Sequence, residues 1–282
     1  MYQPYKAKKQ FEITEFYSAF EYKCDENYSF SGELHDFWEI LIVLDGKLHV
    51  VADELVYSIS KNQMKFHKPM EFHSLCADVE GQSHYFVVSF NASGDFMDQF
   101  SDKVFDLSDE QLVQLGRVLE IYRNEYTNIY DPDITEFIEI ISKKPVIFQK
   151  FVNSLEYFLI MLSDNNATTS NLIYNDETLL YKKAMKILGE YIYSNISVDN
   201  LAKICNVSAA HLKRIFSKYA GIGIHEYFLQ LKISHAKMLL ADGLSVTDVA
   251  ETLSFSSQNY FSVVFKRIEG ISPLKYKKMV HK

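Results

Sequence analysis

The sequence is short of the residues that interrupt regular structure. It holds 10 Gly and 5 Pro among 282 residues, a low content that argues against low-complexity or disordered tracts. It has no run of about 18 apolar residues that would predict a transmembrane helix, and residues 1–6 lack the apolar stretch of a signal peptide. Its three cysteines, Cys24, Cys76 and Cys205, are far apart, which predicts neither a disulfide framework nor a zinc site with paired ligands. We therefore expect a cytoplasmic protein that contacts no membrane.

Basic residues are fewer than acidic residues in the whole chain, but the two kinds are unevenly distributed along it. Residues 176–282 hold 15 Lys and Arg against 9 Asp and Glu, a net charge of +6, whereas residues 1–175 hold 14 against 28, a net charge of −14. The length of the chain predicts two domains. The charge asymmetry indicates that the C-terminal part meets a polyanion, although a domain of this charge is also compatible with simple solvation.

The first hundred residues have the pattern of β-strands. Residues 11–22, 37–51 and 83–90 are rich in Phe, Tyr, Val and Ile and often alternate apolar with polar. Asp45-Gly46 predicts a tight hairpin turn between two of these strands, because such a turn needs a positive φ. Short strands at this spacing predict a small barrel or sandwich.

Helical patterns begin near residue 107. Ser108 and Gln111 form a capping-box sequence, and apolar residues then recur at helical spacing. Residues 145–162 carry a broad apolar face, typical either of a helix enclosed within its own domain or of one shared with a second subunit. Residues 163–176 are polar and without periodicity, so they are the predicted linker.

One local pattern occurs twice in the last hundred residues. Residues 201–208 and 249–256 each contain an alanine, three residues, a turn residue, an apolar residue and a serine, and an amphipathic helix follows each. Two helices that cross steeply need a small residue at their contact, which Ala202 and Ala250 supply. Asn206 tolerates the left-handed conformation of the turn. Ser208 and Ser256 are suited to cap the next helix, so the pattern predicts two helix-turn-helix units.

A single helix connects the two predicted units. Residues 223–240 would form about five turns, roughly 27 Å long. Recognition helices in successive turns of one major groove lie about 34 Å apart, so this connection suits two units that read one duplex.

The chain resembles the AraC/XylS family of transcription regulators over residues 179–280. The resemblance includes Glu226-Tyr227, Leu231-Lys232-Ile233, Ala236, Leu239-Leu240, Tyr260-Phe261, Phe265-Lys266, Gly270-Ile271-Ser272-Pro273 and Tyr276. It implies a dimeric, sequence-specific regulator of transcription that binds double-stranded DNA. The residues that it places toward base edges are Ala209, Ala210, Lys213, Arg214, Ser217, Ser257, Gln258, Asn259, Ser262 and Val263. Those that it places toward phosphates are Ser208, His211, Lys218, Lys266 and Arg267.

Three features depart from the family pattern. Ser254 stands where the family usually has glycine, which predicts a strained or reshaped second turn. Lys232 replaces a usual arginine and could weaken a buried or bidentate contact. Ala210 and Val263 replace bulkier or polar residues that contact bases, and they are suited to contact thymine methyl groups instead.

The N-terminal part resembles the cupin-like effector barrel and the dimerisation helices of such regulators. His35, Glu39 and Gly46 match the first cupin motif, and Pro69 and His73 loosely match the second. The predicted effector pocket contains His35, Trp38, Glu39 and His73. Together with Glu33 these residues offer metal donors, but Glu33 replaces a usual histidine, and we expect neither a metal nor another cofactor.

The predicted architecture is α+β: an N-terminal cupin-like β-barrel, then helices, then an all-α domain. The boundaries are 1–106 for the effector barrel, 107–162 for the helical dimerisation region, 163–176 for the linker and 177–282 for the double helix-turn-helix domain. The predicted function is a small-molecule-responsive, homodimeric transcription regulator and not an enzyme. The alternatives are a metal-dependent cupin enzyme fused to a DNA-binding module, and a regulator that senses no small molecule.

Overall fold

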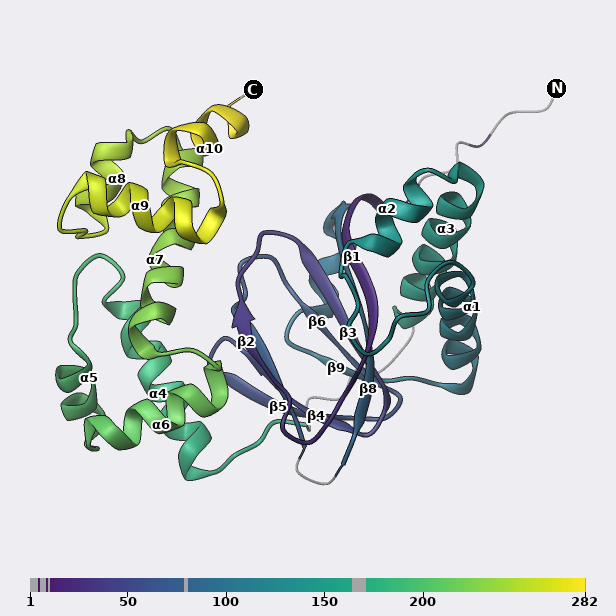
Figure 1. Cartoon of the computed structure of the whole chain (residues 1–282), viewed down its shortest axis with the longest axis horizontal. Coiled ribbons are helices and arrows are strands. Elements are labelled where there is room, and N and C mark those ends of the chain that lie inside the picture. Colours follow the sequence, from purple (N-terminus) through teal and green to yellow (C-terminus); the bar gives the residue numbers. More distant parts are fainter. Residues whose placement is uncertain (1–4, 6–8, 10, 79–80, 164–170, 282) are drawn as a thin grey trace.

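The chain forms a β-barrel flanked on one side by three helices and on the other by a helical domain, as Figure 1 shows for this computed structural model. The structure describes residues 5, 9, 11–78, 81–163 and 171–281. The strands are β1 (Glu12–Cys24), β2 (Ser29–Glu33), β3 (Trp38–Asp45), β4 (Lys47–Ala52), β5 (Leu55–Ser60), β6 (Gln63–His67), β7 (His73–Ala77), β8 (Ser83–Ser93) and β9 (Val104–Asp106). A 3₁₀ helix spans Asp95–Phe100. The α-helices are α1 (Asp109–Glu125), α2 (Glu136–Ser142), α3 (Pro145–Leu162), α4 (Asp176–Glu190), α5 (Val198–Cys205), α6 (Ala209–Ala220), α7 (Ile224–Ala241), α8 (Val246–Thr252), α9 (Gln258–Glu269) and α10 (Pro273–Val280). The α+β class predicted from the sequence is confirmed.

Two antiparallel sheets form the barrel. One has the order β1-β8-β3-β6-β9 and the other β2-β7-β4-β5. Side chains alternate between the faces of a strand, and β3 displays this rule clearly. Ile40 and Ile42 pack outward into the core shared with α1–α3, while Leu41 and Val43 pack into the core between the sheets. The barrel wall is therefore apolar on both faces.

The predicted hairpin at Asp45-Gly46 is wrong. β3 pairs with β6 and β8, whereas β4 pairs with β5 and β7, so the two strands belong to different sheets. The turn is a corner between the sheets. Gly46 has a φ of 75°, and a Cβ there would lie 2.5 Å from the carbonyl oxygen of Gln82. The positive φ was predicted correctly, but it serves a tight corner between layers.

Helices α1, α2 and α3 cover the outer face of the five-stranded sheet (Figure 1). The capping box at the start of α1 is present, since Ser108 accepts from the Gln111 N–H and the Gln111 side chain accepts from the Ser108 N–H. The broad apolar face of α3 is divided. Phe151, Leu155 and Phe158 are buried against the sheet and α1. Val146, Tyr157 and Ile160 are exposed on the outer side.

The segment that precedes α4 contacts the barrel. Residues 164–170 of the predicted linker lie outside the described residues. Leu172 forms an isolated bridge with Tyr57, and the Ile173 N–H donates to the Val56 carbonyl. This part of the predicted linker is therefore attached to the edge strand β5.

The C-terminal domain has two apolar cores that lie at opposite ends of α7. The first joins α4, α5, α6 and the start of α7, and it includes Phe72, Val51 and Val56 from the barrel. The second joins the rest of α7 with α8, α9 and α10. Among the described residues, no helix combines the length and the apolar character needed to cross a bilayer.

Candidate functional site: two recognition helices and a barrel cavity

The first helix-turn-helix unit consists of α5 and α6. Asn206 ends α5 in the left-handed conformation, with φ 61° and ψ 41°, as its sequence position predicts. Ser208 then caps α6, because its side chain accepts a hydrogen bond from the His211 N–H at 3.2 Å. Ala202 is buried beneath the crossing of the two helices. This unit has the local structure expected from its sequence.

The second unit, α8 and α9, has a different turn. Ser254 adopts φ 53°, a left-handed conformation at the position where the family usually has glycine. Its hydroxyl donates to the Tyr193 carbonyl at 2.8 Å, which anchors the turn to the segment between α4 and α5. The predicted cap Ser256 is wrong. Ser257 caps α9 by accepting from the Tyr260 N–H, and five residues separate α8 from α9, against three between α5 and α6.

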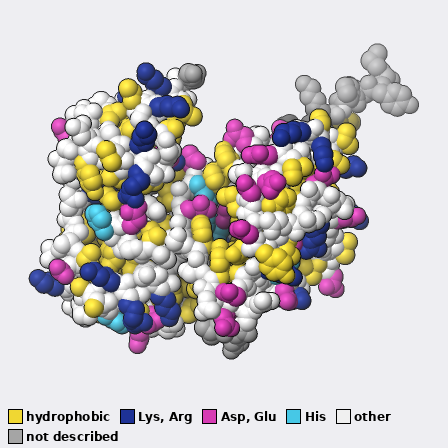
Figure 2. All heavy atoms as spheres, in the orientation of Figure 1, with side chains coloured by type: hydrophobic (Ala, Val, Ile, Leu, Met, Phe, Trp, Pro, Cys, Tyr) yellow, Lys and Arg dark blue, Asp and Glu magenta, His cyan; other side chains and the backbone are white. Residues whose placement is uncertain are grey.

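The predicted DNA-contacting residues of α6 and α9 reach solvent. Ala209 and Ser262 are half-buried, and the others predicted to face bases are exposed: Ala210, Lys213, Arg214, Ser217, Ser257, Gln258, Asn259 and Val263. The residues predicted to meet phosphates are exposed as well: Ser208, His211, Lys218, Lys266 and Arg267. Figure 2 shows Lys and Arg side chains spread over the C-terminal domain, at the left of the view. Neither recognition helix is buried against the barrel along these faces.

Acidic residues of neighbouring helices form ion pairs with several of these basic side chains. Glu177 of α4 pairs with Arg214 at 2.9 Å and with Lys218 at 2.6 Å. Hydrogen bonds from Lys218 and Arg214 lower the pKa of Glu177 to about 2. In the second unit, Glu226 pairs with Arg267 through two hydrogen bonds of 2.7 and 3.1 Å. Each recognition helix thus has an acidic partner on a neighbouring helix.

Lys232 of α7 ties the two units together. Its side chain is 2% exposed, and its Nζ donates to the Ser194 carbonyl at 2.7 Å, the Asn195 Oδ1 at 2.9 Å and the Leu253 carbonyl at 2.6 Å. Burial lowers the pKa of Lys232 to about 8. The lysine that replaces the usual arginine therefore has three oxygen acceptors, one from the end of α8 and two from the segment before α5.

A cavity of about 520 Å³ lies inside the barrel. Aromatic side chains dominate its wall, with polar groups at one end: Tyr17, Phe20, Tyr22, Tyr28, Phe30, Phe37, Tyr85, Glu33, Glu39, His67 and His73. The predicted pocket residues Glu39 and His73 line it. Trp38 does not, because it is adjacent to Glu39 on β3 and its side chain packs on the opposite face, against α1–α3.

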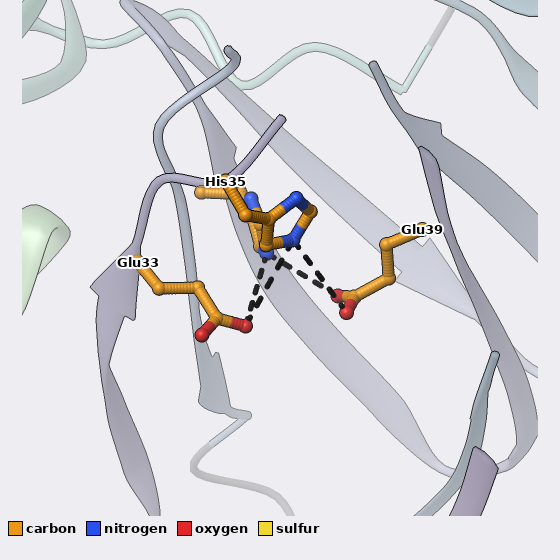
Figure 3. A group of neighbouring side chains, drawn as sticks. Glu33, His35 and Glu39 are labelled. Atoms are coloured by element: carbon orange, nitrogen blue, oxygen red, sulfur yellow. Dashed lines mark ion pairs between the residues drawn. The ribbon is translucent and has the colours of Figure 1, made fainter. Parts of the chain in front are cut away.

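A cluster of four possible metal donors stands at the polar end of the cavity. Figure 3 shows Glu33, His35 and Glu39 pointing toward a common centre, and His73 completes the group. The donor atoms lie within 4.8 Å of one another. Glu39 on β3 and His73 on β7 come from opposite sheets, while Glu33 and His35 come from the end of β2 and the segment that follows.

The charges in this cluster are strongly coupled. Burial disfavours the imidazolium of His73, but the Glu39 and Glu33 carboxylates outweigh this effect and raise the pKa of His73 to about 10. Burial would raise the pKa of Glu39, but His73 and His35 lower it overall. Burial and the charge of His73 lower the pKa of His35. Among its own side chains, the cluster therefore holds a proton on His73 and keeps His35 neutral.

Comparison with known proteins assigns both parts of the chain. The family described as AraC-like ligand binding domain matches residues 15–121, and the family described as helix-turn-helix domain matches residues 201–279. The chain belongs to the AraC family of transcription regulators. This AraC-family regulator is 24% identical to the Msm operon regulatory protein of Streptococcus mutans over 282 aligned residues, 96% of each chain. It is 24% identical to the transcriptional activator RhaR of Escherichia coli K12, covering 88% of this chain and 87% of that protein.

Solved structures give more distant matches. ToxT from Vibrio cholerae is 17% identical, with a TM-score of 0.38 and coverage of 97% of this chain and 99% of that chain. An AraC-type regulator from Chromobacterium violaceum is 26% identical, with a TM-score of 0.34, and covers 36% of this chain and 90% of that chain. The identification of this AraC-family regulator rests on the two sequence families.

The barrel and the DNA-binding domain of the regulator share an interface that the sequence did not reveal. Phe72 of the barrel packs edge-on against Tyr227 of α7, with ring centroids 4.8 Å apart. Gly221, which ends α6, lies so close to β2 that a Cβ at this position would clash with the Ser31 Cα. Asp36 pairs with Lys237 of α7 at 3.7 Å. The barrel therefore contacts both the first recognition helix and the connecting helix.

The loop between α1 and α2 forms part of the cavity wall. Asp131, Pro132, Ile134 and Thr135 line it, and the Ala19 N–H of β1 donates to the Ile134 carbonyl at 3.3 Å. In the sequence, Asp131-Pro132 indicates no more than a break between two helices. The loop's role as a wall depends on a contact with a strand more than a hundred residues earlier, which no local pattern records.

Proposed function

We propose that α6 and α9 of this regulator enter two successive major-groove segments of one DNA duplex. The observation that carries this proposal is the exposure of the predicted base-facing residues on both helices, which lie at opposite ends of the 18-residue α7. A helix of that length spans roughly 27 Å. Successive windows of one groove lie about 34 Å apart, and the widths of the two units supply the remaining distance.

The exposed side chains suit different parts of the duplex. Arg214 is suited to guanine, and Gln258 and Asn259 to adenine edges. Ala210 and Val263 offer apolar contacts to thymine methyl groups. The remaining base-facing residues of the two helices line the same faces. Ser208, His211, Lys218, Lys266 and Arg267 would position the protein by contacting phosphates, which carry no sequence information.

We further propose that the regulator is a homodimer joined through α1 and α3. Val113 of α1 and Tyr157 and Ile160 of α3 expose 62%, 52% and 47% of their surfaces. Helices α1 and α3, which carry them, lie on the side of the barrel away from the DNA-binding domain (Figure 1). A second copy on this face would cover these side chains and leave α6 and α9 free.

The barrel cavity is proposed to hold a small-molecule effector and to serve as a sensor, not as a catalyst. The aromatic wall and the few polar groups at one end are typical of small-molecule sites. The curated relatives reported above are named as regulators, which supports this assignment over that of a cupin enzyme. A regulator of this kind acts where the DNA is, so we place it in the cytoplasm.

A ligand in the cavity has a direct route to the DNA-binding domain. The segment that carries Glu33 and His35 at the cavity also carries Leu34 and Asp36, which contact that domain through its first apolar core and through Lys237. A ligand that moves this segment changes the contacts of α7. Since α7 sets the spacing of α6 and α9, the effector would change the affinity for DNA that requires both helices.

Selection of bound duplexes from a random pool tests the DNA-binding proposal. The purified chain should enrich one sequence, with Arg214→Ala relaxing the preference in one part of it and Gln258→Ala in another. Each lost base contact should cost about 1–3 kcal/mol of discrimination. Lys186→Ala, an exposed residue of α4, is the control and should retain the full sequence. Equal loss of specific and non-specific binding in Arg214→Ala would make Arg214 a phosphate contact.

A further inference from the structure

Two buried histidines aim a ring nitrogen at the same point of the cavity wall. His35 is 8% exposed and His73 is 3% exposed. Nδ1 of His35 lies 3.0 Å from the Phe37 carbonyl oxygen, and Nδ1 of His73 lies 3.1 Å from the Glu71 carbonyl oxygen. A carbonyl only accepts, so each Nδ1 is the donor, and Nε2 is the nitrogen that each ring turns toward the cluster. A cation bound there would take the place of the proton that His73 holds between the two carboxylates.

Among the described residues, neither Nε2 makes a well-aligned hydrogen bond, although the carboxylates of Glu39 and Glu33 lie close to both. Unpartnered buried polar atoms are uncommon in folded proteins and call for an explanation such as a water or an ion. A histidine that donates one N–H to a backbone carbonyl while its other nitrogen points into a shared site has the arrangement of a metal ligand. The two rings therefore point to a bound cation.

Two carboxylates complete the set. Nε2 of His73 lies 3.2 Å from Glu39 Oε1 and 3.6 Å from Glu33 Oε1, and Nε2 of His35 lies 3.8 Å from Glu39 Oε2 and 4.0 Å from Glu33 Oε1. Four ligands at metal bonds of about 2.0–2.2 Å in a tetrahedron are separated by roughly 3.4 Å. The four separations lie on both sides of this value, so small side-chain movements would close the site around an ion.

The surroundings hold the ligands in place. Ser89 donates to Glu39 Oε2 at 2.7 Å, and Ser18 and Ser89 share a further hydrogen bond. The ring of Phe37 stacks on His35 with centroids 3.8 Å apart. Partners of this kind orient metal ligands and affect affinity nearly as strongly as the ligands do.

We propose that the barrel binds one divalent transition-metal ion through Glu33, His35, Glu39 and His73. Two imidazoles and two carboxylates suit Zn²⁺, Fe²⁺ or Mn²⁺ more than Mg²⁺ or Ca²⁺, which prefer oxygen ligands alone. The side chain of Glu33 is 49% exposed and lies on the cavity wall, so one side of the ion faces the cavity. This inference departs from the sequence-based expectation of no metal. That expectation rested on Glu33 standing where a histidine is usual, whereas the structure places the Glu33 carboxylate within 4.8 Å of the other three donor atoms.

Calorimetric titration of the metal-stripped, full-length chain with Zn²⁺, Mn²⁺ and Mg²⁺ tests the proposal. The titration uses neither DNA nor effector, so the metal proposal can fail while the DNA-binding assignment stands. We expect one Zn²⁺ per chain, with affinity falling in the order Zn²⁺, Mn²⁺, Mg²⁺. Glu33→Gln should weaken Zn²⁺ binding more than about tenfold, the lower end of the cost of losing even a supporting partner. His73→Gln should weaken it as well.

His49→Gln is the matched control, because His49 pairs with Asp78 elsewhere on the barrel. It should bind Zn²⁺ as the unaltered chain does. His73 is buried, so its variant could fail to fold, but Glu33 is half-exposed and Glu33→Gln should keep the thermal unfolding temperature of the metal-free protein. The proposal is overturned if the chain binds no stoichiometric Zn²⁺. It is also overturned if Glu33→Gln binds as tightly as the unaltered chain, or if His49→Gln loses as much affinity as Glu33→Gln.

Discussion

Replacing Lys232 by methionine should destabilise the C-terminal domain, because this side chain connects the two helix-turn-helix units. Methionine has a similar length and is apolar, so the change removes the ammonium and its three hydrogen bonds while keeping most of the packing. The lost acceptors are the carbonyls of Ser194 and Leu253 and the side chain of Asn195.

The expected change in the free energy of unfolding is the difference between the hydrogen bonds that are lost and the cost of burying the charge that is removed. Hydrogen bonds to a charged group contribute about 1.5–3 kcal/mol each. Ser194 and Asn195 are exposed and can bind water instead, so the total loss lies near the lower end, about 4–5 kcal/mol. Removing the buried charge also removes the free-energy cost of its burial. That cost is roughly 3 kcal/mol, because burial lowers the pKa of Lys232 from 10.5 to about 8. The net destabilisation is about 1–2 kcal/mol.

Differential scanning calorimetry of the full chain measures this effect. A loss of about 1–2 kcal/mol should lower the unfolding temperature by about 3–6 °C for a chain of this size. The control is Lys186→Met, which replaces an exposed lysine of α4 and should leave that temperature unchanged. An unchanged or raised unfolding temperature in Lys232→Met would refute the reasoning, since burial of the charge would then outweigh its hydrogen bonds.

Two further predictions follow from the surface of the regulator. Glu177→Gln should free Lys218 for a phosphate and Arg214 for a base edge, tighten non-specific DNA binding and steepen its salt dependence by about one in slope, because one more phosphate is neutralised. Fluorescence anisotropy at several salt concentrations measures the affinity for DNA and its salt dependence. Glu190→Gln is the control and should bind as the unaltered chain does. An unchanged slope in Glu177→Gln would contradict the prediction. If two copies pair through α1 and α3 as proposed, Ile160→Asp should yield monomers, because the aspartate would be buried there without a partner. Analytical ultracentrifugation measures the mass of the particle in solution. Val280→Asp on α10 is the control and should not change that mass. If Ile160→Asp remains dimeric, the interface lies elsewhere.

Local patterns predicted the local structure well. The start of α1 at Ser108, the bounds of α3 and the left-handed Asn206 each depend on residues within a few positions of one another. Ser254 was also identified, since a non-glycine residue in a glycine position predicts a strained turn, and its φ of 53° agrees.

Features that depend on distant contacts were not predictable in the same way. A positive φ at Gly46 suits a hairpin and a corner between sheets equally, and only the pairing of β3 and β4 with other strands separates the two. The ion pairs of Glu177 and the contact of Gly221 with β2 join segments far apart in the chain. The error at Trp38 was avoidable, because Trp38 and Glu39 are adjacent on one strand and cannot both face the cavity.

Hydroxyl-radical footprinting of the full chain on its selected DNA sequence tests the central claim most directly. The account predicts two protected windows on one face of the duplex, with centres about one helical turn, or 10–10.5 base pairs, apart for each protomer. Arg214→Ala should weaken protection in one window and Gln258→Ala in the other. A single window, or two windows on opposite faces of the duplex, would contradict the claim that α6 and α9 read successive segments of one groove.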